Sequence, residues 1–133
     1  MTKRNVIKLM DNTPMVFTVI GISSHENDYR LSWSINEQLK LSLVQNTSII
    51  TGDSQEFSCF VHKDDVRRLQ LISNRCDDGF LLEKYKNIDY FLKIDGELNE
   101  TETAEWLRDV RKVPLVSAAF PITVNKQILK LLG

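Results

Sequence analysis

The order strand, helix, strand is expected twice in this chain, and that repetition constrains the fold more than any other feature. The first such segment covers 15–50 and the second covers 88–124. Each begins with a run rich in β-branched and aromatic residues, 15–22 in the first and 88–95 in the second, which is typical of buried strands. Because strand–helix–strand connections are right-handed, we expect both helices on the same face of one sheet.

Apolar periodicity predicts the first helix over 28–40. Leu31 and Ile35 share one face at 100° per residue, and that face is expected to pack on the sheet. Either Asn27 or Asp28 is a suitable N-cap, because a short side-chain oxygen can accept a hydrogen bond from a free amide of the first turn.

The second helix has signals at both of its ends. Asn99 and Glu102 resemble a capping box, in which each side chain bonds the backbone N–H of the other residue. The helix is expected to reach about Lys112, because Val113 precedes a proline and so disfavours helical geometry. Trp106 falls on the face that is expected to be buried.

The middle of the chain is predicted to be β structure. A strand is expected over 41–50, with an irregularity at 46–47, and the alternating apolar residues of 56–73 predict a hairpin. The Asp-Gly pair at 78–79 is a strong signal for a further chain reversal.

These elements predict an α+β fold in which two βαβ units flank a β-hairpin and pack their helices on one face of a sheet, a ferredoxin-like or ACT-like sandwich. Residues 15–123 are expected to form a single domain, after a lead-in over 1–14 and before a C-terminal tail over 124–133. Residues 5–10 are either an edge strand or a tail. The similar spacing of the two units fits either an internal duplication or two units of similar architecture.

Charge and hydropathy exclude several classes of function. The net charge of −1 over 133 residues argues against non-specific nucleic-acid binding, which needs a strong cationic field. No segment approaches the ~20 consecutive apolar residues of a membrane span. The first residues do not resemble a secretory signal, so we expect a cytoplasmic protein without nucleic-acid or membrane partners.

The cysteines and histidines are too few and too dispersed to predict a metal site. Cys59 and Cys76 form no CxxC pair, and the only histidines are His25 and His62. Cys59 lies in an apolar run and is interpreted as a small buried hydrophobic residue, although a disulfide with Cys76 remains possible on sequence alone. Neither a metal nor any other cofactor is predicted.

Several separated blocks together resemble the IPExxxVDY family of small bacterial proteins, typical of the Bacteroidetes. The blocks are GISSHENDYRLSW, LISNR, GFLLEKYKNIDYFL and VPLVSAAFPI. Ile88-Asp89-Tyr90 matches the second half of the motif that names the family, whereas Leu82-Glu83-Lys84 stands where the family has Ile-Pro-Glu. The resemblance implies a bacterial cytoplasmic protein and assigns no catalytic residues.

A candidate ligand site lies at the corner between the first strand and the first helix. Ser23 and Ser24 could hold an anion through free amides and the helix dipole, or could simply make turn and capping bonds. Asp28, Arg30 and Arg75 complete the predicted set, because an arginine can bind a carboxylate in bidentate fashion.

Ion pairs are an alternative use of the same charges. Arg30 could pair with Asp28, and Arg75 could pair with Asp77 or Asp89. His25 is interpreted as a polar loop residue rather than a catalytic base, because no second catalytic group lies near it in sequence.

The opposite face of the first helix is a candidate interface. Tyr29, Trp33 and Asn36 fall away from the predicted buried face, so either loop 46–56, the C-terminal tail or a partner must cover the two aromatic rings. We therefore expect a non-enzymatic interaction or regulatory module that forms a homodimer. The alternative is a small-metabolite (carboxylate or anion) binding protein, or an enzyme, that uses the corner around Asp28 and Arg30.

Overall fold

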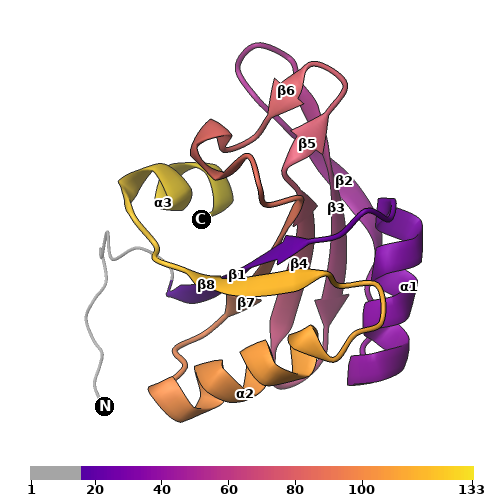
Figure 1. Cartoon of the computed structure of the whole chain (residues 1–133). Helices are drawn as coiled ribbons and strands as arrows, with labels where there is room; N and C mark the ends of the chain where they lie inside the picture. Colours follow the sequence, from indigo (N-terminus) through magenta and orange to yellow (C-terminus); the bar gives the residue numbers. More distant parts are fainter. Residues whose placement is uncertain (1–15) are drawn as a thin grey trace.

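The computed structural model describes residues 16–133, so the predicted element at 5–10 lies outside the described residues (Figure 1). The fold is α+β, with a six-stranded sheet in the order β2-β3-β4-β7-β1-β8, and every neighbouring pair of strands is antiparallel. The strands of this sheet are β1 (Phe17–Ser23), β2 (Val44–Ile50), β3 (Glu56–Lys63), β4 (Arg68–Ser73), β7 (Tyr90–Asp95) and β8 (Ala118–Ile122). The other elements are α1 (Asp28–Leu39), the short hairpin β5 (Arg75–Cys76) and β6 (Gly79–Phe80), the 3-10 helix η1 (Glu83–Tyr85), α2 (Glu100–Arg111) and α3 (Lys126–Leu132).

β1 lies between β7 and β8 and pairs with both of them. Gly21, in the middle of β1, is opposite Phe91 on one side and Phe120 on the other. A Cβ atom at Gly21 would lie 2.9 Å from Cδ1 of Ile88 and 3.0 Å from Cδ1 of Ile122, so these two side chains close over the glycine. β2, β3 and β4 form a meander that leaves β2 at one edge of the sheet and β8 at the other.

Helices α1 and α2 cover one face of the sheet, as predicted. Leu31 and Ile35 of α1 and Val110 of α2 are fully buried and belong to the same apolar cluster as Ile20 of β1 and Leu92 of β7. Alternate residues of β1, β4 and β7 point into this layer, as the period of a strand requires.

The other face of the sheet is covered by α3 and by the segment between β4 and β7. Ile128 and Leu132 of α3 pack with Phe17 and Val19 of β1 and with Phe91 of β7. The C-terminal residues are therefore part of the packed body of the protein, and Figure 1 shows α3 lying apart from α1 and α2.

The predicted helix ends are confirmed. The side chain of Asn27 accepts a hydrogen bond from the amide of Arg30, and α1 ends at Leu39, followed by the C-cap Lys40 in a left-handed conformation with φ 58°. Both bonds of the predicted capping box are present between Asn99 and Glu102. None of the helices in residues 16–133 is long and apolar enough to span a membrane.

One buried asparagine organises the segment between β4 and β7. Asn74 is 0% exposed, and its side-chain amide donates to the carbonyl oxygens of Tyr85 at 3.0 Å and Ile88 at 2.9 Å. Its Oδ1 accepts from the amide of Leu82 at 2.8 Å. The chain leaves the sheet between β4 and β7, and these bonds take the place of strand pairing there. They fix the position of Asp89, which directly precedes β7.

Candidate functional site

The predicted corner is a real hollow in the surface, with a volume of about 550 Å³. It lies where β1 runs toward α1, beside the end of β4 and the start of β7. Three of the five predicted ligand residues, Ser23, Ser24 and Arg75, line it together. The complete lining is Ser23, Ser24, His25, Glu26, Ser73, Arg75, Asn87, Asp89 and Tyr90.

Asp89 is the anion that this corner already holds. One carboxylate oxygen accepts from the amide of Ser24 at 2.8 Å, and the other is bonded by Nε of Arg75. The Ser24 hydroxyl donates to the carbonyl oxygen of Leu115 at 2.7 Å, and the Ser23 hydroxyl donates to that of Asn87 at 2.6 Å. The serines therefore tie three distant segments together.

Arg75 is held in one orientation by three contacts. Besides the pair with Asp89, one terminal nitrogen donates to the carbonyl oxygen of Lys86 at 3.1 Å. The guanidinium also lies over the ring of Phe80, 5.0 Å from its centroid. Of the two predicted ion-pair partners, Asp77 and Asp89, the structure selects Asp89.

The other two predicted ligand residues are less central. Asp28 lines an adjacent hollow of about 490 Å³ that shares Arg75 and Tyr90 with the corner, whereas Arg30 lines neither hollow. The expected Arg30–Asp28 pair is wrong, because Nε of Arg30 bonds Oε1 of Glu26 at 2.7 Å instead. Residues four apart lie one above the other at a helix surface, and residues two apart do not.

Tyr90 is a fixed hydrogen-bond donor in this corner. Its hydroxyl donates to the carbonyl oxygen of Glu26 at 2.7 Å. Burial, and to a lesser degree the charges of Asp28, Asp89 and Glu26, raises the pKa of Tyr90 to about 12. The phenol is therefore neutral near pH 7 and keeps the start of α1 attached to β7.

The face of α1 opposite the sheet, where Tyr29 and Trp33 were predicted to lie, exposes both aromatic side chains. Trp33 is 64% exposed and Tyr29 is 60% exposed. Tyr29 nevertheless has intramolecular contacts, since its hydroxyl donates to Gln45 at 2.6 Å and its ring meets the ring of Phe60 edge-on. Asn36 also has intramolecular contacts, because its side-chain amide both donates to the carbonyl oxygen of Leu43 and accepts from the amide of Leu43.

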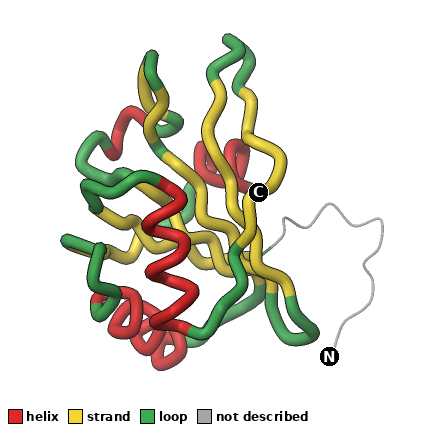
Figure 2. Tube along the Cα trace, turned by 90° about the vertical axis from the view of Figure 1, so that its right-hand side faces the viewer, coloured by secondary structure: helices red, strands yellow, loops and turns green. Residues whose placement is uncertain are grey.

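Neither cover considered for this face shields Trp33. The C-terminal helix packs in the apolar cluster of the opposite sheet face, and Figure 2, in which α1 lies toward the viewer, shows the two helices apart. Residues 46–56 form most of β2 and the turn that follows it, and they leave Trp33 64% exposed.

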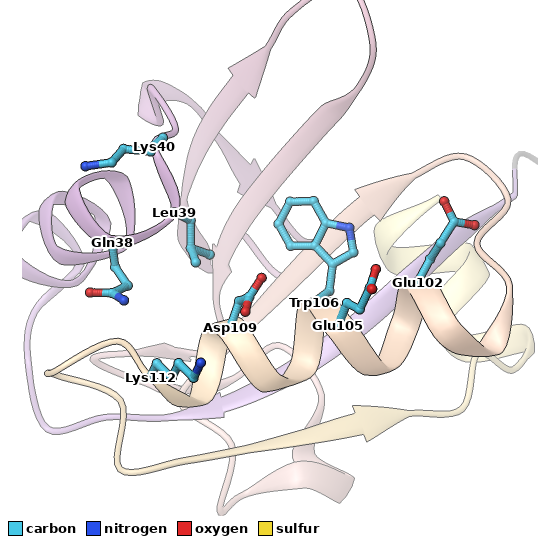
Figure 3. Close-up of a pocket in the computed structure, with 8 residues that line it drawn as sticks. All are labelled: Gln38, Leu39, Lys40, Glu102, Glu105, Trp106, Asp109 and Lys112. Atoms are coloured by element: carbon cyan, nitrogen blue, oxygen red, sulfur yellow. The ribbon is translucent and has the colours of Figure 1, made fainter.

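A groove between the end of α1 and the outer side of α2 was not predicted (Figure 3). It has a volume of about 430 Å³, and Trp106 and Leu39 supply its apolar surface. Its lining is Gln38, Leu39, Lys40, Glu102, Glu105, Trp106, Asp109 and Lys112. The sequence signal that could have predicted this groove is the spacing of Glu102, Glu105 and Asp109, which lie one or two turns apart along α2. Two of these carboxylates have local partners, because Glu102 caps α2 and Asp109 bonds Arg108 at 3.2 Å.

The cysteines are free thiols, so the possible disulfide between Cys59 and Cys76 is not present. Cys59 is buried, and this burial raises the pKa of its thiol. Within residues 16–133 there is no group of three or more His, Cys, Asp or Glu side chains that could hold a metal ion.

No protein-family model matches the chain, and no curated protein was found to resemble it. The resemblance to the IPExxxVDY family therefore stays a prediction.

Proposed function

We propose that the protein is a non-enzymatic interaction module that forms a homodimer through the outer face of α1. The observation that carries this proposal is Trp33, which is 64% exposed on a helix whose opposite face is fully buried. Tryptophan is enriched among the residues that dominate binding energy at protein interfaces, because it buries a large apolar area and loses little side-chain entropy.

The neighbouring residues support this face as a preformed surface. Tyr29 is attached to β2 through Gln45 and to β3 through Phe60, and Asn36 is bonded to the chain that leads into β2. Side chains that are already ordered lose less entropy when a partner binds. Trp33 thus stands on a rigid helix between two anchored positions.

Substitution of Trp33 tests the proposal. We expect the wild-type protein to be a dimer at micromolar concentration in sedimentation velocity, and we expect Trp33→Ala to raise the dissociation constant by about 30-fold, the effect of one interface hot spot. Val66, which is 82% exposed between β3 and β4, supplies the matched control, because Val66→Ala also removes exposed apolar surface. A wild-type protein that sediments as a monomer would contradict the proposal.

A second candidate function is the binding of a small carboxylate at the corner. It is supported by the convergence of Ser23, Ser24 and Arg75 on one hollow. Because Asp89 already accepts the bonds that an anion would take, a carboxylate ligand has to compete with it. Binding therefore depends on whether the ligand or Asp89 forms the stronger bonds with the Ser24 amide and Arg75.

Neutralising Asp89 tests this second candidate. In a thermal-shift screen of small carboxylic acids, Asp89→Asn should increase the stabilisation by any acid that binds, and Arg75→Ala should abolish it. Arg30→Ala is the control, because Arg30 lines neither hollow. If no acid stabilises the wild-type protein or Asp89→Asn, this candidate is excluded.

A further inference from the structure

The outer face of α1 carries a regular pattern of charges around Trp33. Glu26 and Lys40 lie seven residues before and after Trp33, and Arg30 and Glu37 lie three residues before and four residues after it. Within α1, Arg30 and Glu37 fall within about 60° of the direction of Trp33 at 100° per residue. Glu26 lies just before the N-cap of the helix and Lys40 is its C-cap, so these two charges flank Trp33 at the two ends of α1. Arg30, Trp33, Glu37 and Lys40 are exposed, and Glu26 is half-buried.

The signs of these charges reverse across Trp33. From the beginning of the stripe to its end they run negative at Glu26, positive at Arg30, negative at Glu37 and positive at Lys40. When the stripe is placed against a copy of itself in the opposite direction, each acid therefore lies opposite a base and each base lies opposite an acid. Such a surface is electrostatically complementary to its own inverted copy.

We infer that the partner of this face is a second copy of the chain, docked with the two α1 helices antiparallel and the two-fold axis passing at Trp33. This inference rests on the function proposed above and specifies the geometry of the dimer. The two Trp33 rings then meet at the axis, Glu26 faces Lys40 of the second copy, and Arg30 faces Glu37 of the second copy. In an isologous interface each of the two charge contacts occurs twice, and the contact between the Trp33 rings occurs once on the axis.

A parallel arrangement of the same helices is disfavoured. It would place Arg30 against Arg30 and Glu37 against Glu37, and like charges across an interface are strongly unfavourable. The antiparallel arrangement also aligns the positive end of each helix dipole with the negative end of the other.

Within the described part of the chain, the stripe has no intramolecular alternative that satisfies all of its charges. Arg30 bonds Glu26 through Nε at 2.7 Å, and this contact leaves the terminal nitrogens of the guanidinium for a second carboxylate. Glu37 lies two helical turns from Arg30, too far along α1 to pair with it within one chain. Among the described residues Glu37 and Lys40 make no salt bridge.

Two complementary charge reversals test the geometry. In Arg30→Glu, position 30 carries an acid that faces Glu37 of the second copy, and in Glu37→Arg, position 37 carries a base that faces Arg30 of the second copy. Each variant alone should dimerise about tenfold or more weakly than wild type, because each dimer contains two repelling contacts. Mixed in equal amounts, the two variants should form a heterodimer in which both contacts are attractive.

Native mass spectrometry distinguishes the heterodimer from both homodimers by mass. Lys130→Glu, on α3 at the opposite face of the sheet, and Glu97→Arg, in the loop before α2, are the matched controls, since each makes the same change in net charge as one test variant. The control proteins should dimerise like wild type.

The outcomes separate this inference from the proposed function. If Trp33→Ala weakens the dimer but the mixed charge variants form no heterodimer beyond the level of the control mixture, the α1 interface survives and the antiparallel geometry is overturned. If the wild-type protein is a monomer, both are overturned. Preferential heterodimer formation supports both.

Discussion

Asp64, in the turn between β3 and β4, is a single side chain that makes the stability of this fold depend on pH. Its carboxylate accepts hydrogen bonds from Nε2 of His62 and from the amides of Val66 and Arg67, each at 2.8 Å. His62 is in the correct tautomer for this role, because its Nδ1 accepts from the amide of Ser42 at 2.9 Å and the ring proton is therefore on Nε2. These bonds favour the charged carboxylate, with that from His62 foremost, and lower the pKa of Asp64 from 3.8 to about 2.

This shift predicts a loss of stability in acid. Because the folded-state pKa lies below the unfolded value, the contribution of Asp64 is complete above about pH 4 and is lost as the pH falls toward 2. Urea unfolding of the wild type and of Asp64→Asn should show that the advantage of the wild type shrinks over this range. An advantage that is constant from pH 5 to pH 2 would contradict the assignment.

Individual residues of the site were only partly predictable. Ser23, Ser24 and Arg75 were identified because serines before a helix and an arginine in a turn have recognisable chemistry. The roles of Asn74 and Asp89 depend on partners far away in sequence, such as the Ser24 amide, 65 positions from Asp89. Local patterns contain no information about such pairings.

At the level of elements, the helices were predicted well because their signals are local. The expected helix over 28–40 is α1, and the capping box at Asn99 does begin α2. The irregularity expected at 46–47 is a β-bulge between Asn46 and Ile49. The 3-10 helix η1 was missed, because a single turn has no apolar period and here depends on bonds to Asn74.

The contact between α2 and β8 leads to a prediction for Arg111. Two nitrogens of its guanidinium donate to the carbonyl oxygen of Ala119, at 3.1 and 2.9 Å, and attach the last turn of the helix to the edge strand. Arg111→Ala should lower the free energy of unfolding by about 1.5 kcal/mol, the low end of the range for hydrogen bonds to charged groups, because Arg111 is exposed. Denaturant titration measures this loss.

Arg108 provides the control from the same helix. Among residues 16–133 its side chain bonds only the adjacent Asp109, and it is exposed, so Arg108→Ala should change the free energy of unfolding by less than about 0.5 kcal/mol. Equal losses for the two variants would show that the Ala119 contact contributes nothing specific.

For the molecule as a whole, the main addition to the predicted fold is the second covered face of the sheet. The α+β class and the common face of α1 and α2 follow from apolar periodicity and the handedness of connections. Residues 124–133 were predicted as a C-terminal tail, and the surface on which they pack could not be predicted, because the apolar residues of "ILKLL" fit any uncovered surface. The position of β1 between β7 and β8 likewise depends on long-range pairing.

The C-terminal helix should therefore be essential for stability. Ile128 is 0% exposed, and Ile128→Ala should lower the free energy of unfolding by about 2–5 kcal/mol through the cavity that it creates in the core. Lys130→Ala, an exposed position in the same helix, should be nearly neutral. Denaturant unfolding compares the two, and similar stabilities would show that α3 is dispensable for the core.

The two edges of the sheet differ in a way that limits how copies of the protein can assemble. On β8, Pro121 has no N–H to donate and the carbonyl of Ala119 is occupied by Arg111, whereas β2 contains neither proline nor charge in its sequence VQNTSII. On β2, the bulge between Asn46 and Ile49 interrupts the ladder, so neither edge presents a long regular strand on which further chains could extend the sheet into a filament.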